Sequence, residues 1–463
     1  MLRRYIGDRA FYRKTLTIAL PIILQSFISN FVSMLDNLMV GQLSTAQISG
    51  VTIINNNLLL IFTLCLFGGA GGAGIFTAQF FGARDHDGIR HTMRFKLITC
   101  LALLVVFGAV FYFLPDPLIR LYLQGEGDAE LAASTLLYAR QYLHMMLPGL
   151  LPLALTYVYA GTLRECGQPT VPMLASGVAA GINLVLNYLL IYGKLGLPAM
   201  GIRGAALATV ISRYAEFGII LLWTQAHTGL LPFIRGLYSS LYIPAALTRS
   251  ILKVALPLLL NDALYSFGVA FLNQCYSTCG LDVVPALSIS STIYSISAVA
   301  FRSLGNAVGI FMGQLIGSGA DEPRLRAHFR QLTALTIVTG TLFAITMACL
   351  SGVFPQLYNT SSQIRRLSAA LILINAAVMP LQAYAYPVFF TIRAGGKTAV
   401  AAIFDCGAVW VLNLPLAFIL SHFTAASITV IYALVNATDI IKCILGYFLI
   451  KGRFWMQNLS HNS

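Results

Sequence analysis

The chain has 463 residues, of which 58% are hydrophobic and 10% are charged, and its mean hydropathy is +0.79. A soluble globular protein carries about 25% charged residues, so this composition excludes that class. The net charge of +13 would suit a nucleic-acid-binding protein. The basic residues gather in alternate connecting segments, however, so we attribute the positive charge to the orientation of the chain in a membrane.

Twelve apolar stretches are long enough to cross a bilayer as helices, which takes about 20 residues. Short polar segments separate them. The sequence therefore predicts an all-α membrane protein with twelve transmembrane helices, near residues 16–40, 50–72, 93–114, 136–160, 171–192, 203–226, 251–275, 283–312, 330–353, 366–390, 398–420 and 425–450.

Basic residues are dense in alternate connecting segments. If the N-terminus is cytoplasmic, the inward segments hold 21 of the 29 Lys and Arg residues, and Arg213 and Arg302 lie inside predicted spans. Cytoplasmic loops of membrane proteins are enriched in Lys and Arg. We therefore predict a multi-pass plasma-membrane protein with both termini in the cytoplasm. The first apolar stretch is longer than the core of a cleavable signal peptide.

The first predicted span carries a carboxylate, Asp36, with no Lys or Arg close to it in sequence. An acid at that depth costs roughly 2.5 to 3.5 kcal/mol on insertion scales. Gln25, Ser29 and Asp36 share one helix face, which we expect to line a wet cavity. Such a carboxylate can bind a proton, or coordinate Na⁺ together with other oxygen ligands. Hydrogen bonding to neighbouring helices alone is the alternative.

The chain contains an internal repeat. Residues 19–25, ALPIILQ, recur as ALPLLLN at 255–261, and GIFTAQ at 74–79 recurs as GIFMGQ at 309–314. Six spans per copy leave both copies in the same orientation, as in transporters built from parallel repeats. We predict two six-helix lobes, residues 1–226 and 251–463, joined by a cytoplasmic linker at 227–250.

The first copy carries polar groups where the second carries apolar or aromatic ones; Asp36, for example, aligns with Leu272. Asp36, Asn187 and Thr209 fall at similar depths below the outer ends of their spans, and Asn183 lies one turn from Asn187 on the same helix face. We expect these four polar groups to converge in the outer half of the N-terminal lobe.

Four of the other charged groups inside predicted spans are interpreted as structural, and the roles of Asp262, Arg302 and Asp405 stay open. Two pairs spaced by three residues can neutralise each other on one helix, namely Arg213 with Glu216 and Asp439 with Lys442. Asp262 and Arg302 fall at similar depths and are predicted to form a buried pair. Asp405 lies about two turns from the predicted cytoplasmic surface and is expected to be hydrated there.

The sequence contains no HExxH, GxSxG or GxxxxGK[ST] motif, so it gives no support to a metalloprotease, a serine hydrolase or an ATP-driven pump. A GxGD motif at 125–128 lies in an outward loop without a partner Asp in a neighbouring span, and we treat it as chance. The eight cysteines are scattered. We predict no enzyme activity, no catalytic residues, no cofactor and no resident metal. A membrane enzyme is the alternative from a different class.

Over nearly its whole length the chain resembles the multidrug and toxic compound extrusion (MATE) family. The resemblance is carried by ALPIILQ with downstream Asp36 and MVGQL (39–43), GAGIFTAQFFGARD (72–85), LRECGQPT (163–170), NLVLNYLLIYG (183–193) and GAALATVISR (204–213). It implies two six-helix lobes, alternating access, and export of amphipathic, often cationic compounds in exchange for H⁺ or Na⁺. The chain is closer to the DinF-like prokaryotic branch than to the NorM-type branch, whose acids on spans 7 and 10 are replaced here by Tyr265 and Gln382.

The resemblance also implies roles for individual residues. Asp36 is similar to the family's first-span coupling carboxylate, Asn183 to its fifth-span Asn and Thr209 to its sixth-span Thr. Asn187 stands where many similar members carry a second carboxylate, so a two-carboxylate mechanism is in doubt. Together these four residues are the predicted site for proton or cation coupling.

We therefore predict a secondary active antiporter, monomeric in the lipid bilayer, that exports small amphipathic or cationic molecules. Its substrate cavity is predicted to be lined by Gln25, Ser29, Tyr157 and Tyr159, with one of the two tyrosines pointing elsewhere because residues two apart do not share a helix face. The second hypothesis is a lipid-linked oligosaccharide flippase of the same superfamily. A flippase would be expected to line its cavity with several basic residues, and often to have two further spans.

Overall fold

The computed structural model describes residues 6–123, 129–424 and 426–460. Within these ranges all regular elements are helical, and twelve helical segments are long and apolar enough to cross a membrane. The predicted fold class is therefore confirmed. The GxGD motif at 125–128 lies outside the described residues.

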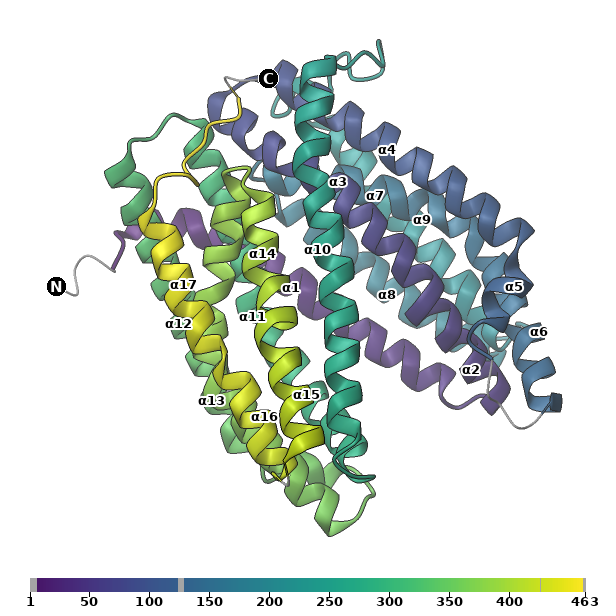
Figure 1. Ribbon diagram of the computed structural model, residues 1–463. Coiled ribbons are helices and arrows are strands. Elements are labelled where there is room, and N and C mark those ends of the chain that lie inside the picture. Colours follow the sequence, from purple (N-terminus) through teal and green to yellow (C-terminus); the bar gives the residue numbers. More distant parts are fainter. Residues whose placement is uncertain (1–5, 124–128, 425, 461–463) are drawn as a thin grey trace. The chain divides into compact units, whose positions relative to one another are not determined.

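Contacts divide the chain into two compact units (Figure 1). The N-terminal unit contains residues 24–77 and 85–249, and the C-terminal unit contains residues 1–23, 78–84 and 250–463. Two helices, α1 (Arg9–Val40) and α3 (Leu59–Ala83), contribute residues to both units. The chain changes unit after Arg249, at the end of the predicted linker 227–250. Residues 1–23 and 78–84, which we predicted in the N-terminal lobe, belong to the C-terminal unit by their contacts.

The remaining helices of the N-terminal unit are α2 (Thr45–Ile53), α4 (His86–Phe113), α5 (Pro115–Arg120), α6 (Ala129–Met146), α7 (Leu150–Glu165), α8 (Thr170–Tyr192) and α9 (Ile202–Ala226). A π-helical turn, Ile54–Leu58, joins α2 to α3, and a 3₁₀ turn, Leu147–Gly149, joins α6 to α7. Each of these joined pairs counts as one span. The N-terminus of α4 is capped by Asp85, whose side chain accepts a hydrogen bond from the Gly88 amide at 2.9 Å.

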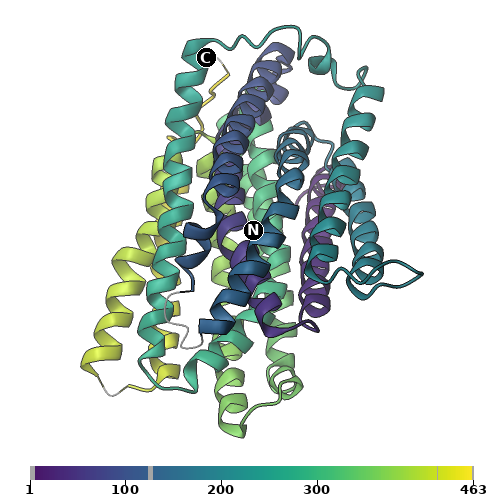
Figure 2. The same cartoon turned by 90° about the vertical axis from the view of Figure 1, so that its right-hand side faces the viewer.

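The C-terminal unit contains most of α10 (Ala245–Ser277), with α11 (Val283–Gly317), α12 (Glu322–Leu350), α13 (Ser362–Ala394), α14 (Thr398–Ala408), α15 (Leu414–Phe423), α16 (Ile428–Ala437) and α17 (Asp439–Lys451). A π-helical turn, Val409–Asn413, joins α14 to α15. Helices α11, α12 and α13 pack against one another, and they lie side by side as the green helices of Figures 1 and 2.

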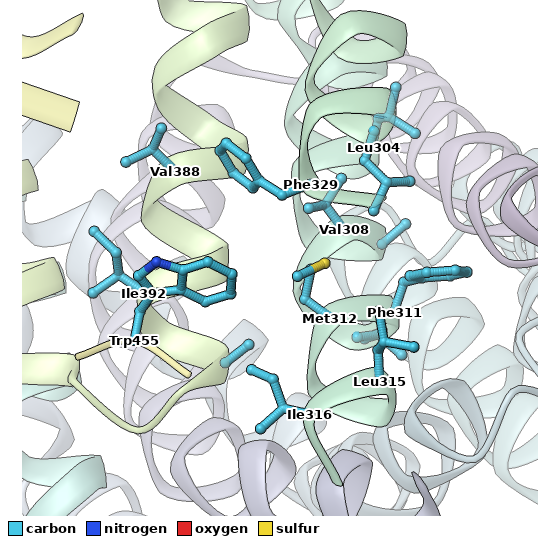
Figure 3. Packing of buried hydrophobic residues seen from close by; sticks show 14 of the residues in the cluster. Leu304, Val308, Phe311, Met312, Leu315, Ile316, Phe329, Val388, Ile392 and Trp455 are labelled. Atoms are coloured by element: carbon cyan, nitrogen blue, oxygen red, sulfur yellow. The ribbon is translucent and has the colours of Figure 1, made fainter. Parts of the chain in front are cut away.

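A large apolar core fills the end of the C-terminal unit at which α11 and α13 end (Figure 3). Side chains of α11, α12, α13 and α14 form most of it, and α1 adds Phe11 and Ile18. Trp455, which follows α17, is fully buried there, and its indole nitrogen donates to the Ile450 carbonyl at 2.9 Å. The chain after the last helix is therefore part of the folded unit.

The repeated GIF motifs meet each other inside the C-terminal unit. The end of α3 packs against α11 so closely that a Cβ atom on Gly82 would overlap the backbone of Gln314. The equivalent glycine of the second copy, Gly317, has the same relation to the backbone of Gln79. The Gln79 side chain in turn donates to the Ala394 carbonyl at 2.7 Å and accepts from the amide of Leu459 at 2.6 Å. The two motifs thus form a symmetrical helix crossing that requires glycine on both sides.

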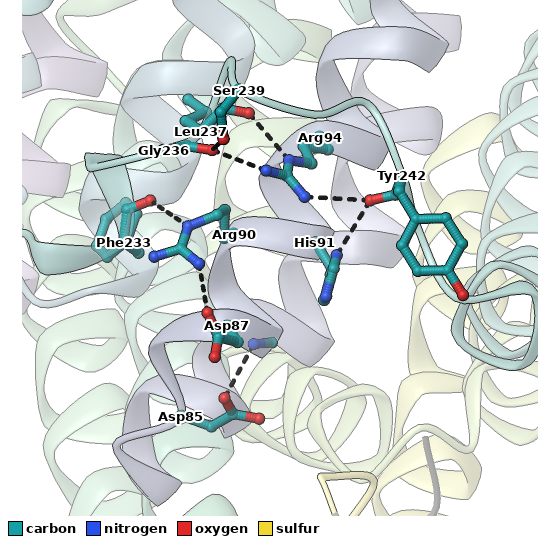
Figure 4. Close-up of polar contacts among 11 residues, drawn as sticks. Asp85, Asp87, Arg90, His91, Arg94, Phe233, Gly236, Leu237, Ser239 and Tyr242 are labelled. Carbon is teal, nitrogen blue, oxygen red and sulfur yellow. Dashed lines mark hydrogen bonds and ion pairs between the residues drawn. The ribbon is translucent and has the colours of Figure 1, made fainter.

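The predicted linker forms a strap, residues 228–244, that is bound to α4 within the N-terminal unit (Figure 4). Arg94 donates to the carbonyls of Gly236, Leu237 and Tyr242 at 2.7, 2.9 and 3.2 Å. Arg90 donates to the Phe233 carbonyl at 3.2 Å. Phe233 and Leu237 are buried. The amphipathic middle of this segment therefore packs on its own unit.

The glycine crossing gives the first testable prediction. Gly317→Ala is expected to destabilise the purified protein by about 1–3 kcal/mol, because the added methyl group has no space beside the Gln79 backbone. Gly218→Ala on α9 is the matched control, since a Cβ atom there meets no neighbouring atom within 4 Å. The thermal unfolding midpoint in detergent, followed by intrinsic fluorescence, measures both. Equal midpoints for the two variants would contradict the assigned close approach.

Candidate transport site

The four residues predicted to form the coupling site come together in the N-terminal unit. Asn187 on α8 donates its side-chain amide to the Asp36 carboxylate of α1 at 2.6 Å, and to the Asn183 carbonyl oxygen at 3.0 Å. Asn183 donates to Thr209 Oγ1 of α9 at 3.4 Å and to Ser212 Oγ at 3.5 Å. The chain of bonds joins three helices and ends on Asp36. The role of these residues in coupling stays a prediction.

The hydrogen bonds of this network have a defined direction. Thr209 and Ser212 each donate their hydroxyl hydrogen to a carbonyl one turn earlier in α9, at 2.9 Å in both cases, and so present their oxygens as acceptors to Asn183. Both asparagines are buried, with 4% of Asn183 and 1% of Asn187 exposed. The side-chain carbonyl oxygen of Asn187 makes no hydrogen bond within the described residues. An unpaired oxygen therefore lies on the residue that binds Asp36.

A cavity of about 170 Å³ adjoins the network. Its lining comes entirely from α1, α8 and α9, namely Ile28, Ser29, Val32, Asp36, Ser176, Ala179, Ala180, Asn183, Thr209, Ser212, Arg213 and Glu216. Two carboxylates and one guanidinium thus face a small space. Gln25 approaches the same region, because its amide donates to Ser176 Oγ at 2.8 Å.

Glu216 is a cavity residue that the sequence reasoning assigned to a different role. Its carboxylate accepts a hydrogen bond from Ser176 of α8, and the described residues contain no ion pair between Glu216 and Arg213. Arg213 donates instead to the Gly149 carbonyl at 3.4 Å. The two charges of α9 are therefore not in direct contact, although each interacts electrostatically with the other. The signal that could have identified Glu216 is its position seven residues after Thr209, which places both on one face of α9.

The two candidate tyrosines do not line this cavity. Tyr159 is fully buried, its hydroxyl shares a hydrogen bond with that of Tyr238 in the strap, and its ring meets Phe217 edge-on at 5.9 Å. Tyr157 is half-buried and lies within electrostatic range of Arg164 and Arg213. The side chain of Tyr159 is therefore committed to packing of its own unit.

The C-terminal unit contains a larger cavity of about 540 Å³, lined by Tyr, Asn and Ser side chains and by Asp405, Asp439 and Lys442. Lys442 donates to the Asp405 carboxylate at 2.7 Å. Gln382 donates to Asp439 at 3.0 Å and accepts from the hydroxyl of Tyr294 at 2.5 Å. The three charges therefore belong to two separate hydrogen-bonded groups on the wall of one cavity.

This cavity corrects three sequence-based expectations. The direct ion pair of Lys442 is with Asp405 on α14, and its predicted partner Asp439, on the same helix, interacts with it only electrostatically. Asp405, which we expected to be hydrated, forms that ion pair. The predicted pair of Asp262 with Arg302 is wrong: Arg302 lies 5.6 Å from the ring of Tyr386, and Asp262 accepts from the Asn261 amide at 3.4 Å.

Comparison with known proteins assigns the family. The family model MatE matches residues 21–189 and 257–419, which together cover most of the chain and both copies of the repeat. The chain belongs to the MATE family. Among the described residues, no cluster of three or more His, Cys, Asp or Glu side chains could hold a metal ion.

Relatives of this MATE chain extend over nearly its full length. It is 25% identical over 421 residues to "Probable multidrug resistance protein NorM" of Thermotoga maritima, covering 89% of this chain and 86% of that protein. It is also 25% identical over 430 residues to "Probable multidrug resistance protein YoeA" of Bacillus subtilis, covering 92% and 90%.

Solved structures of MATE proteins share the fold. A crystal structure of MATE in complex with MaD3S matches with a TM-score of 0.83 at 19% identity, covering 98% of this chain and 97% of that one. The outward-facing structure of a multidrug resistance MATE family transporter of the MOP superfamily matches with a TM-score of 0.82 at 19% identity, covering 97% of each chain. The architecture is therefore that of the family.

The mostly buried Lys442–Asp405 ion pair gives the second prediction. Lys442→Met is expected to destabilise the protein by about 1–3 kcal/mol, because it leaves the Asp405 carboxylate, 24% exposed, without its partner. Lys442→Met combined with Asp405→Leu should recover most of that loss, since replacing a whole buried pair is often neutral. The unfolding free energies of wild type, of Lys442→Met, of Asp405→Leu and of the double variant together give the coupling energy as a double-mutant cycle.

An exposed ion pair provides the control for this measurement. Arg140 lies 3.6 Å from Asp116, with 54% and 39% of the two side chains exposed. Arg140→Gln should therefore cost about 0–1 kcal/mol. If Lys442→Met cost no more than Arg140→Gln, the Lys442–Asp405 pair would not be the buried interaction described above.

Proposed function

We propose that this protein is a secondary active antiporter that exports amphipathic or cationic small molecules in exchange for H⁺ or Na⁺, with Asp36 as the coupling carboxylate. The observation that carries the proposal is the bond from Asn187 to Asp36, which places a membrane-embedded acid on the wall of a cavity between three helices. Intramembrane acids of this kind mark ion or substrate pathways. The names of the relatives, which are multidrug resistance proteins, support export as the direction.

The geometry suits coupling to a single positive charge at Asp36. Asn187 is a neutral donor, so the network supplies no second acid next to Asp36 to share a proton. A proton on Asp36 would weaken the charge-assisted bond from Asn187 and thereby loosen the link between α1 and α8. Na⁺ would instead find hard oxygen ligands on Asp36, on Thr209 and on the unpaired carbonyl oxygen of Asn187.

The volumes of the two cavities suggest which of them suits the coupling ion and which suits the substrate. Pockets for drug-sized molecules measure about 300–1,000 Å³. The 170 Å³ space beside Asp36 is smaller, so in this conformation it suits the coupling ion, while Gln25, Ser29 and Glu216 extend the polar surface toward a substrate. The 540 Å³ cavity of the C-terminal unit is within the drug-sized range, and we include it in the proposed substrate path.

The energy of one coupled charge is sufficient for this activity. One elementary charge moving down 100 mV supplies about 2.3 kcal/mol. At about 1.4 kcal/mol per decade, that supports a substrate gradient of roughly 40-fold. A flippase for lipid-linked oligosaccharide is less well supported, because the cavities contain one basic side chain each, Arg213 in one and Lys442 in the other.

The finer assignments are part of the same proposal. We place the chain nearer the DinF-like branch than the NorM-type branch, because the acids of its C-terminal cavity are Asp405 and Asp439 while Tyr265 and Gln382 occupy the positions expected to be acidic in the NorM-type branch. We also propose a monomer in the plasma membrane with both termini in the cytoplasm, without a cofactor or catalytic activity.

Efflux from proteoliposomes under an imposed pH gradient or an imposed Na⁺ gradient tests the proposal. Asp36→Asn is expected to abolish gradient-driven efflux while preserving the thermal unfolding midpoint, because the amide keeps the hydrogen-bonding shape of the carboxylate and loses its charge. Asp282→Asn, outside the network, is the matched control. Undiminished efflux by Asp36→Asn would overturn the assignment of Asp36 as the coupling carboxylate. The gradient that drives efflux by the wild type identifies the coupling ion.

A second variant tests whether coupling depends on one acid. Asn187→Asp places a second carboxylate within hydrogen-bond distance of Asp36, and two such groups share a proton. If protons drive transport, half-maximal efflux should move to higher pH by about one unit or more. Asn183→Asp, one turn further from Asp36, should move it less. Identical pH profiles for wild type and Asn187→Asp would show that Asp36 does not bind the transported proton.

A further inference from the structure

A groove of about 430 Å³ lies on the C-terminal unit, apart from both cavities described above. Helices α12, α13 and α17 are labelled in Figure 1, and α12 and α17 each pack against α13. The residues that line the groove come from these three helices. Its lining is basic at one end and apolar or aromatic along its length: Arg326, Phe329, Arg330, Thr333, Ala334, Ile337, Tyr384, Tyr447, Ile450 and Lys451. The basic end is at the start of α12 and the end of α17.

One of the basic residues holds the two helices together. Arg326 donates to the carbonyls of Ile450 and Lys451, which end α17, at 3.0 and 2.9 Å. Its guanidinium also pairs with Glu322 at 2.8 Å, and Glu322 pairs with Arg453 at 2.9 Å. The donors of Arg326 and the carboxylate of Glu322 are therefore engaged in structural bonds near the basic end of the groove.

The other two basic residues are available to a ligand. Within the described residues, no carboxylate lies within 4 Å of the side-chain nitrogens of Arg330 or Lys451. Glu322 is already shared between Arg326 and Arg453, so it does not neutralise them. The end of the groove thus carries uncompensated positive charge on two different helices.

A second observation also points to a ligand. Thr333 lines the groove with 5% of its surface exposed, and its hydroxyl has no hydrogen-bond partner within the described residues. A buried hydroxyl without a partner is costly, so an acceptor supplied from outside the chain would stabilise it. Ala334 and Ile337 continue the groove as an apolar surface, and Ile337 is about 10 Å along the helix from Arg330.

We propose that this groove binds an anionic phospholipid. The phosphate lies between Arg330 and Lys451, the ester oxygens of the glycerol accept from Thr333, and an acyl chain follows Ala334 and Ile337. The order of charge, hydroxyl and apolar surface along α12 matches the order of groups along a phospholipid entering the bilayer. The basic end is also the one that the distribution of Lys and Arg predicts to be cytoplasmic, the leaflet in which anionic lipids attract basic clusters.

A bound lipid would connect α12 and α17 beyond the contacts of Arg326. A soluble anion would use the basic end alone and leave Thr333 and Ile337 without a role. A protein partner would need a larger and less enclosed surface than a groove of this volume. The observations therefore favour a lipid as the occupant.

Photolabelling tests the proposal. Full-length protein is reconstituted in phosphatidylcholine vesicles containing a photoactivatable phosphatidylglycerol or, in parallel, a photoactivatable phosphatidylcholine with the same acyl probe. Peptides that contain residues 326–337 and 447–451 are then quantified by mass spectrometry. We expect phosphatidylglycerol to label these peptides severalfold more than phosphatidylcholine. Equal labelling by the two lipids would overturn the proposal.

Matched variants identify the residues responsible. Arg330→Gln combined with Lys451→Gln should reduce labelling by phosphatidylglycerol about tenfold or more, because each basic residue near the membrane surface contributes to anionic lipid binding. Arg324→Gln combined with Lys253→Gln removes the same charge from exposed positions outside the groove and should keep wild-type labelling. Equal labelling of the two double variants would overturn the site.

Two further arms separate a lipid from a free phosphate and from a folding defect. Glycerol phosphate at the same concentration as the lipid probe should not reduce labelling; full displacement would reassign the groove to a soluble phosphate. Ile337→Trp fills the acyl end and should reduce labelling while leaving Arg330 and Lys451 in place. The unfolding midpoint of each variant is measured in phosphatidylcholine, and we expect the wild-type value. A loss of labelling then results from weaker lipid binding at the groove and not from unfolding.

Discussion

The structure depends on one constraint: polar groups within the hydrocarbon region must find partners inside the protein, because no water is there to bind them. Lys96 shows how the chain meets this constraint for a charged group. This side chain is fully buried, yet its ammonium pairs with Glu165 and donates to Thr162 at 3.3 Å. Its position near a predicted cytoplasmic end gave no sign of burial. Partnering across helices therefore shapes each unit as much as apolar packing does.

The two copies of the repeat meet this constraint in different ways. The asparagine of the NYLLIYG segment, Asn187, donates to Asp36 in the N-terminal unit. In the second copy Leu412 and Asn413 correspond to Leu186 and Asn187. Asn413 accepts at 2.6 Å from Thr438 Oγ1, and within the described residues no hydrogen bond joins it to an acid. The C-terminal unit carries its charges elsewhere, on Asp405 and Lys442. One ancestral pattern of helices thus supports a neutral network around a single carboxylate in one half, and an ion pair on a larger cavity in the other.

This difference matters for transport. A carboxylate bound by a neutral amide can change its charge without leaving an oppositely charged group unpaired. Protonating Asp405 would leave Lys442, of whose side chain 14% is exposed, without its ion-pair partner. This contrast is the physical reason for proposing the coupling ion at the N-terminal network. The Lys442–Asp405 pair is better suited to a constant role in shaping its cavity.

The number of spans, the repeat and the polar face of α1 were all readable from the sequence, because apolar length and helical periodicity are local properties of a chain. The contact of Asn183 with Asn187 was also readable, since both lie on one helix a single turn apart. To predict that Asn187 and Thr209 lie near Asp36, the depth of each residue had to be estimated from the predicted end of its span. These estimates were accurate enough because all three residues lie near the same ends of their helices.

Partners on neighbouring helices were decided by the tertiary structure alone. The sequence paired Glu216 with Arg213 and Lys442 with Asp439 because they are three residues apart, but Glu216 binds Ser176 and Lys442 binds Asp405. A side chain in a membrane helix takes the best partner that any adjacent helix presents, and which helix is adjacent follows from packing. The groove between α12 and α17 has the same origin, because its basic and apolar residues become one surface only when both helices rest on α13.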